Sequence, residues 1–132
     1  MNLNFTLSEL IKSDTATKND INNLPDLNSL DNLLNLIVFC LQPLRDKIQR
    51  PIIISSGYRC NKLNRLVGGA GNSQHLLGCA ADFKVQGMTI EQTIDFIKKS
   101  GIEYDQLINE YDRWVHISYS NGRNRKSCFK IG

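Results

Sequence analysis

The chain has 132 residues, with 16 Lys and Arg against 13 Asp and Glu, and 41% of its residues are hydrophobic. This length predicts one domain over residues 1–132 whose core is large enough to fold without disulfides, and the composition excludes collagen-like, low-complexity and disordered proteins. The formal net charge of +3 is modest and argues against a nucleic-acid binder, which would carry a denser basic stripe.

The first part of the chain is predicted to be helical. Thr6-Leu7-Ser8-Glu9 has the pattern of a capping box that opens a short helix. The polar stretch 13–28 predicts a surface segment with at most one helical turn. Apolar residues then recur at helical spacing over 30–41, which predicts the longest helix, and Pro43 either kinks this helix or begins a second one. The apolar stretch is too short to cross a membrane.

Strands dominate the middle of the chain. The β-branched run 52–56 predicts a buried strand. Residues 60–78 are rich in Gly, Asn and Ser, and they predict one helical turn near 62–66 followed by a long loop, a feature that is usually functional in a compact domain. Residues 79–85 are predicted to form a second strand.

The sequence pattern of the last part of the chain predicts a helix followed by a β-hairpin. A capping box at Thr89 opens a helix that ends near Ser100-Gly101. Residues 104–111 and 114–119 predict two strands joined by a tight turn, which must therefore be antiparallel. The order of elements predicts an α+β fold, with helices packed on one face of a small, largely antiparallel sheet. A solvated C-terminal tail is expected to carry the basic cluster Arg123, Arg125, Lys126 and Lys130.

The cysteines and the N-terminus bear on the cellular compartment. None of the 4 cysteines forms a CxxC pair, which argues against a zinc ribbon, and Cys40 lies in an apolar helical pattern typical of core packing. The opening residues lack a basic start followed by an apolar core, so we expect synthesis in the cytoplasm, without a signal peptide and with reduced thiols.

The chain has 2 histidines, His75 and His116, and both are candidate metal ligands. Side chains alternate along a strand, so Asp82 is expected on the face opposite Phe83, where a half-buried carboxylate needs an ion pair or a metal. His116 shares a face with Trp114, opposite an apolar face, and is expected to face a cleft or solvent. Two histidines and one carboxylate match the protein ligands of a catalytic zinc, which keeps a fourth position open. An arginine ion pair for Asp82 is the alternative, and Cys79 is a competing ligand.

A zinc hydrolase also needs a general base and a cation that stabilises a developing oxyanion. Glu110 precedes His116 across the predicted turn, and antiparallel pairing would bring it back near that histidine. Asp112 is closer in sequence but lies in the turn, where Asp is favoured for local hydrogen bonds. Arg59 follows the Gly57 turn and could grip a carboxylate in a bidentate manner. The alternatives are a solvated acid for Glu110 and a structural ion pair for Arg59.

Three stretches together carry a resemblance to a known family: Ser56-Gly57-Tyr58-Arg59, Ser73-Gln74-His75-Leu76-Leu77-Gly78-Cys79-Ala80-Ala81-Asp82 and Trp114-Val115-His116-Ile117-Ser118. They resemble the zinc D-alanyl-D-alanine carboxypeptidase family, which includes related phage peptidoglycan endopeptidases. Its Ser-x-His-x6-Asp motif is matched by Ser73, His75 and Asp82. The resemblance covers nearly the whole chain and is closest to the small single-domain branch that bacteriophages and prophages often encode.

The resemblance implies that His75, Asp82 and His116 bind one Zn²⁺ per chain. It implies that Glu110 is the catalytic base, and that Arg59 stabilises the scissile carbonyl oxygen or a substrate carboxylate. The hedgehog/DD-peptidase fold follows from the same resemblance.

Two further residues are assigned to the substrate, and one position departs from other branches. The resemblance implies that Ser73 contacts the substrate, and Trp114 is a further candidate substrate-binding residue. In other branches the acid lies three residues before the last histidine, where this chain has Arg113.

The resemblance therefore implies a zinc-dependent peptidoglycan peptidase, encoded by a phage or prophage as an endolysin, that cleaves a stem peptide or cross-link. The alternatives are a non-catalytic zinc-binding or cell-wall-binding module on the same fold, and a general interaction domain with structural histidines. We expect peptidoglycan stem peptides as partners, no nucleic acid or membrane partner, and a monomer. Without a signal peptide, the protein would reach the cell wall after holin-type release or as a virion-carried enzyme.

Overall fold

A computed structural model of the protein describes residues 3–132. The helices, some of them short, are α1 (Leu7–Ile11), α2 (Asp14–Lys18), α3 (Leu27–Leu36), η1 (Ile37–Leu41), α4 (Gln42–Ile48), α5 (Asn61–Leu66), η2 (Gln74–Leu77) and α6 (Ile90–Ser100). The strands are β1 (Ile52–Ser56), β2 (Ala80–Val85), β3 (Gln106–Glu110), β4 (Trp114–Ser118) and β5 (Ser127–Ile131). This order of elements is the predicted one, with two additions: the short helix η2 within the predicted loop, and a strand at the C-terminal end.

The strands form a five-stranded mixed sheet in the order β1-β2-β4-β3-β5. β1 with β2, β2 with β4, and β3 with β4 are antiparallel, whereas β3 and β5 are parallel. The sheet is therefore largely antiparallel, and the predicted α+β class is confirmed. The predicted hairpin is also present, with Glu110 opposite Trp114 next to its turn.

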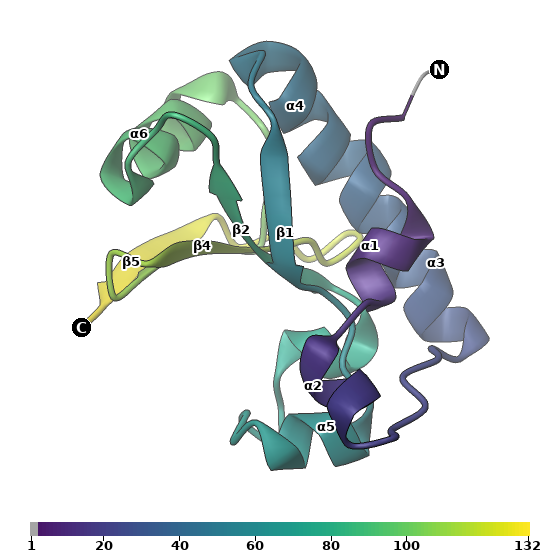
Figure 1. Ribbon diagram of the computed structural model, residues 1–132. Helices are drawn as coiled ribbons and strands as arrows, with labels where there is room; N and C mark the ends of the chain where they lie inside the picture. Colours follow the sequence, from purple (N-terminus) through teal and green to yellow (C-terminus); the bar gives the residue numbers. More distant parts are fainter. Residues whose placement is uncertain (1–2) are drawn as a thin grey trace.

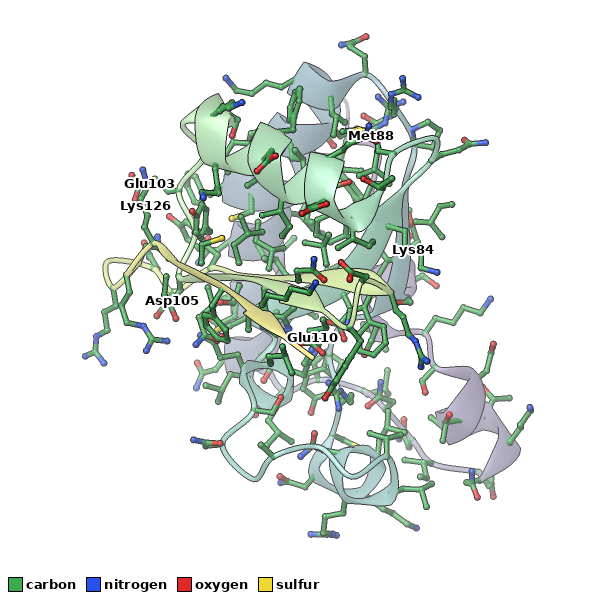
Figure 2. All side chains as sticks on the ribbon, turned by 90° about the vertical axis from the view of Figure 1, so that its left-hand side faces the viewer. Lys84, Met88, Glu103, Asp105, Glu110 and Lys126 are labelled. Carbon is green, nitrogen blue, oxygen red and sulfur yellow. The ribbon has the colours of Figure 1, made fainter. Side chains whose placement is uncertain are left out.

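The two faces of the sheet differ in chemistry, because side chains alternate along each strand. Phe83, Val115 and Ile117 are fully buried in the main core on one face. Asp82 and His116 lie on the other face, as the alternation predicted. The sheet is seen nearly edge-on in Figure 2, with α6 above it and α5 below. The core helices thus cover one face, and the polar face remains for the candidate site.

The long apolar helix is continuous from α3 to α4 but changes geometry at η1, which is π-helical (Figure 1). Pro43 lies in the first turn of α4. Proline lacks an N–H and removes one helical hydrogen bond, and a π-helical turn is one way to accommodate such a loss. Pro43 therefore begins a second helical segment, one of the two outcomes expected. Leu33, Leu36 and Leu44 are fully buried along this helix.

β1 differs from the sequence prediction, which placed a buried strand here. It is an edge strand whose described neighbour in the sheet is β2. Ile52 is buried, but Ile53 is 58% exposed. A run of β-branched residues favours a strand wherever it lies in a sheet, so the run cannot distinguish an edge strand from a central one.

The C-terminal segment also differs from the expected solvated tail. β5 pairs with β3, and Arg125, just before it, forms an ion pair with Asp105 at 2.8 Å. Lys130 lies 2.9 Å from Asp112. These basic residues therefore have acidic partners within the fold. A five-residue edge strand that is rich in charge gives little periodic signal, which explains why the sequence pattern missed it.

The polar segment 13–28 contains α2, as the expected single turn of helix, but it is not only a surface segment. The side chain of Asn23 is buried, donates hydrogen bonds to the carbonyl oxygens of Ile11 (2.8 Å) and Tyr58 (3.0 Å), and accepts one from the Cys60 N–H (2.8 Å). Asn23 thus makes hydrogen bonds to the backbone of the residues on both sides of Arg59.

Within residues 3–132, none of the helices has the length and apolar character needed to cross a bilayer. Cys40 is fully buried, as predicted, and its Sγ donates to the Glu103 carbonyl oxygen at 2.9 Å. Burial raises the pKa of the Cys40 thiol to about 12. All four cysteines are free thiols in the structure.

Candidate active site

Three buried side chains, His75, Asp82 and His116, form a cluster on the polar face of the sheet. Asp82 on β2 and His116 on β4 are directly paired across the two strands. His75 reaches the cluster from η2, and its ring meets the His116 ring edge-on, with centroids 5.2 Å apart. One nitrogen or oxygen atom from each residue lies within 4.8 Å of the others. The structure therefore brings the three predicted ligands together.

The orientation of His75 is fixed by the backbone. Nδ1 of His75 lies 2.7 Å from the Gly57 carbonyl oxygen, and because a carbonyl only accepts, we assign the proton to Nδ1. Nε2 is then the free ring nitrogen, 3.4 Å from Asp82 Oδ2. Gly57 itself is required by space, because a Cβ there would lie 2.2 Å from the Leu10 carbonyl oxygen. A ring nitrogen held in this way is typical of a metal-binding histidine.

Asp82 accepts contacts from both histidines and remains charged. His116 Nδ1 lies 3.0 Å from its Oδ1. Burial by itself would raise the pKa of Asp82, but the side-chain contacts with His116 and then His75 outweigh burial and hold this pKa below its usual range. No arginine among residues 3–132 forms an ion pair with Asp82, so the structural alternative considered from the sequence is not realised.

The donor set fits a zinc ion. Ligands of a tetrahedral zinc, each about 2.0–2.1 Å from the ion, are roughly 3.4 Å apart. The Asp82 carboxylate reaches both histidines at about this spacing, with Oδ2 3.4 Å from His75 Nε2 and Oδ1 3.0 Å from His116 Nδ1. Two imidazoles and one carboxylate also supply the nitrogen and oxygen ligands that zinc prefers. Cys79 lies outside the cluster, although it was a competing candidate from the sequence.

Glu110 lies beside this cluster. Its Oε1 is 3.7 Å from His116 Nδ1, at the end of β3. Burial and then the charge of Asp82 raise the pKa of Glu110 above its ordinary value. The indole N–H of Trp114 is buried beside this carboxylate and favours its charged form, although the contact lacks the geometry of a hydrogen bond. Glu110 is labelled in Figure 2 at the sheet, between α6 and α5.

Asp112, the other candidate base, is engaged elsewhere. It lies in the hairpin turn with φ of 55°, accepts a hydrogen bond from the Asn109 side chain at 2.8 Å, and pairs with Lys130 at 2.9 Å. These contacts lower the pKa of Asp112, first through Asn109 and then through Lys130. The geometry therefore favours Glu110 over Asp112 as the acid next to the cluster.

Arg59 is half-buried and faces the same acids. Burial lowers the pKa of Arg59, while the charges of Asp82 and Glu110 oppose this shift. Its Nη1 donates to Asn64 Oδ1 at 3.3 Å, and its Nε is buried without a hydrogen-bond partner among the described residues. It forms no ion pair within residues 3–132. A cation with unused donors, near two carboxylates, is suited to bind an anionic group in the site.

A groove of about 890 Å³ joins these residues. It is lined by the cluster, Glu110 and Arg59, and also by Ser73 and Trp114. All seven residues assigned from the sequence therefore lie along one groove: Arg59, Ser73, His75, Asp82, Glu110, Trp114 and His116. Its volume is at the upper end for ligand sites and holds several residues of a peptide. The groove is also lined by Lys12 and Asp14, from the connection between α1 and α2 and from the start of α2.

Ser73 has a structural contact in addition to its place in the groove. Its Oγ accepts a hydrogen bond from the His75 N–H at 3.2 Å and caps η2. Sequence reasoning missed two buried residues that hold Arg59, namely Asn23 and Asn64. Each is an asparagine in a polar stretch, and no local pattern distinguishes such a residue from a solvated one.

Comparison with known proteins adds one match. The family model described as Peptidase M15 matches residues 3–118, which is most of the chain and includes every residue of the candidate site. The match ends at the last residue of β4. A search of curated proteins finds no matching relative.

Proposed function

Because the chain belongs to the peptidase M15 family, the metallopeptidases of the zinc D-alanyl-D-alanine carboxypeptidase type, we propose that it hydrolyses a peptide bond of bacterial peptidoglycan. The observation that carries the proposal is the buried cluster of His75, Asp82 and His116, with Glu110 next to it in a groove. A purely structural metal site would not need the additional carboxylate, nor the cation of Arg59, which forms no ion pair within residues 3–132.

His75, Asp82 and His116 would hold the zinc ion. Zinc, when bound, would supply Lewis-acid chemistry, polarising a carbonyl group and making water a better nucleophile at neutral pH. Glu110 accepts the proton of the attacking water and returns it to the leaving amine. The raised pKa of Glu110 suits this role, because a general base works best when its pKa is near the operating pH.

Arg59 donates to negative charge on the substrate, either the oxygen of the scissile carbonyl or a nearby carboxylate. Its Nη2 makes no hydrogen bond within residues 3–132 and is not among the buried atoms, which leaves a donor available to a substrate group. Ser73 and Trp114 also line the groove and would contact the peptide. Preorganised donors of this kind contribute strongly to catalysis because they need no reorganisation during the reaction.

The substrate is a stem peptide or cross-link, and residues 1–132 act as one monomeric peptidase domain. The proposed biological setting is lysis by a phage or prophage, with the enzyme reaching the wall through a holin pore or carried by the virion. The groove volume supports a substrate that contributes several residues.

Digestion of purified peptidoglycan by the zinc-loaded protein, followed by mass spectrometry of the products, tests the proposal. A carboxypeptidase releases free D-alanine, whereas an endopeptidase releases fragments with new peptide ends. Glu110→Gln serves as the inactive control. Intact peptidoglycan that binds the protein without being cleaved would instead identify a non-catalytic module.

A further inference from the structure

The contact that orients the Arg59 guanidinium comes from a single buried side chain. Asn64, in the middle of α5, is 2% exposed. Its Oδ1 accepts from Arg59 Nη1 at 3.3 Å, and its Nδ2 donates to the Ala70 carbonyl oxygen at 2.9 Å. Within residues 3–132, the Arg59 side chain makes no other hydrogen bond. The direction of the guanidinium thus depends on Asn64.

An amide is the group that satisfies both contacts. The guanidinium of Arg59 only donates and the carbonyl of Ala70 only accepts, so the residue between them needs one acceptor and one donor on adjacent atoms. Aspartate would supply acceptors alone, and leucine would fill a similar volume with neither. Burial makes the requirement strict, because an unpaired polar group without water costs free energy.

Gly69 lies against the contact between Asn64 and Arg59. A Cβ on Gly69 would lie 2.0 Å from Asn64 Oδ1 and 2.8 Å from Arg59 Nη1. The backbone of residue 69 is therefore packed directly on the contact between the amide and the guanidinium. Gly69 also donates its N–H to the Asn64 carbonyl oxygen at 2.9 Å. By contrast, a Cβ on Gly71 would have no neighbour within 4 Å.

We propose that Asn64 is a positioning residue that acts through Arg59, and that residue 69 must be glycine to leave room for this contact rather than to form a turn. The inference rests on the proposed function, because it assigns Asn64 the task of directing the remaining donors of Arg59 toward the substrate. The same amide donates a hydrogen bond to the Ala70 carbonyl oxygen, in the loop that precedes Ser73 and His75. One side chain therefore connects the Arg59 cation to the loop before the first histidine.

Kinetics of Asn64→Leu, alone and combined with Arg59→Lys, test this directly. We expect kcat/KM for a soluble peptidoglycan fragment to fall about 10- to 100-fold in Asn64→Leu, the range for outer partners of active-site groups. In the Arg59→Lys background the same change should have little further effect, because residues that act through one contact are not additive. Zinc content should remain that of the wild type. Equal losses in both backgrounds would overturn the proposal.

A second pair of variants separates positioning from folding. Gly69→Ala should reproduce the kinetic loss, because its methyl group displaces the Asn64 amide, whereas Gly71→Ala should stay within about twofold of the wild type. If Asn64→Leu does not fold, Gly69→Ala tests the same contact, and Asn64→Asp keeps the bond to Arg59 while removing the one to Ala70. Equal activity in Gly69→Ala and Gly71→Ala would overturn the proposal.

A third readout needs no activity. NMR signals of the Arg59 guanidinium, assigned by their loss in Arg59→Lys, should show restricted rotation in the wild type and free rotation in Asn64→Leu. Unchanged signals in Asn64→Leu would overturn the positioning role. A wild-type protein that leaves peptidoglycan intact would instead refute the proposed function, while the NMR measurement would still decide whether Asn64 holds Arg59.

Discussion

Asp82 and His116 lie directly opposite each other on β2 and β4, with His116 Nδ1 3.0 Å from Asp82 Oδ1, although the two residues are 34 positions apart in the chain. The ladder of backbone hydrogen bonds between the strands fixes this spacing before any ion arrives. His75 completes the cluster from η2, where the Gly57 carbonyl oxygen holds its ring. A ligand set ordered in advance loses little conformational entropy on binding, which favours affinity.

The first prediction follows from this geometry. The purified protein should bind about one zinc ion per chain, and alanine at His75, Asp82 or His116 should lower the occupancy measured by elemental analysis. Zinc should also raise the melting temperature of the wild type by mass action. Asp112→Asn is the matched control and should keep its zinc. Folded wild-type protein that takes up no zinc on reconstitution would contradict the prediction.

Glu110→Gln should remove the general base while preserving size and the three ligands. We expect peptidoglycan cleavage to fall by a factor of about 100 or more, the range for general acid–base groups, with normal zinc content. Turnover measured by product release checks the first effect and elemental analysis the second. If Asp112→Asn is inactive while Glu110→Gln cleaves normally, the wrong carboxylate has been assigned.

Arg59→Lys keeps the charge but loses the planar fork, and the two side chains are not equivalent at sites that need several donors. We expect kcat/KM to fall by the equivalent of about 2–4 kcal/mol, the scale for one oxyanion donor. Zinc content and melting temperature should hardly change. A variant that melts early but cleaves normally while folded would show that Arg59 is structural.

Asp105 should make the fold sensitive to acid. This carboxylate is 3% exposed, and it accepts from Arg125 Nε at 2.8 Å and from Gln74 Nε2 at 2.7 Å. The hydrogen bond from Arg125 is the main cause that lowers the pKa of Asp105 to about 2. Figure 2 shows Asp105 at one end of the sheet, below the pair of Glu103 and Lys126.

Because the pKa of Asp105 is lower in the folded state than the usual value of about 3.9, its contribution to stability is present above pH 4 and lost as the pH falls toward 2. The contribution amounts to about 2 kcal/mol. Urea unfolding at pH 7 and pH 2.5 should show a larger loss for the wild type than for Asp105→Asn. The exposed Asp31→Asn is the control and should follow the wild type at both pH values.

Asn23→Ala should destabilise the fold by about 1–3 kcal/mol, since it leaves the backbone groups of Ile11, Tyr58 and Cys60 without their hydrogen-bond partner. Urea unfolding measures the change. The neighbouring Asn22 is exposed, so Asn22→Ala should be nearly neutral. Equal stability of the two variants would mean that water replaces the side chain of Asn23.

Much of the local structure could be predicted from the sequence. The capping boxes at Thr6 and Thr89 are both present, with the side chains of Glu9 and Gln92 closing them. These motifs involve residues three apart, so the local backbone determines them. The alternation that separates Asp82 from the core is equally local, because it depends only on the period of a strand.

The sequence by itself determined which residue types could bind a metal, and on which strand face Asp82 and His116 lie. Only the tertiary structure decided that Lys130 on β5 pairs with Asp112, that β1 is an edge strand, and that Asn64 holds Arg59. The physical reason is that local patterns report the period of the backbone and the burial of a face. Strand order and the partners of a buried amide depend instead on how distant segments fill one core together, and that packing leaves no periodic trace in the chain.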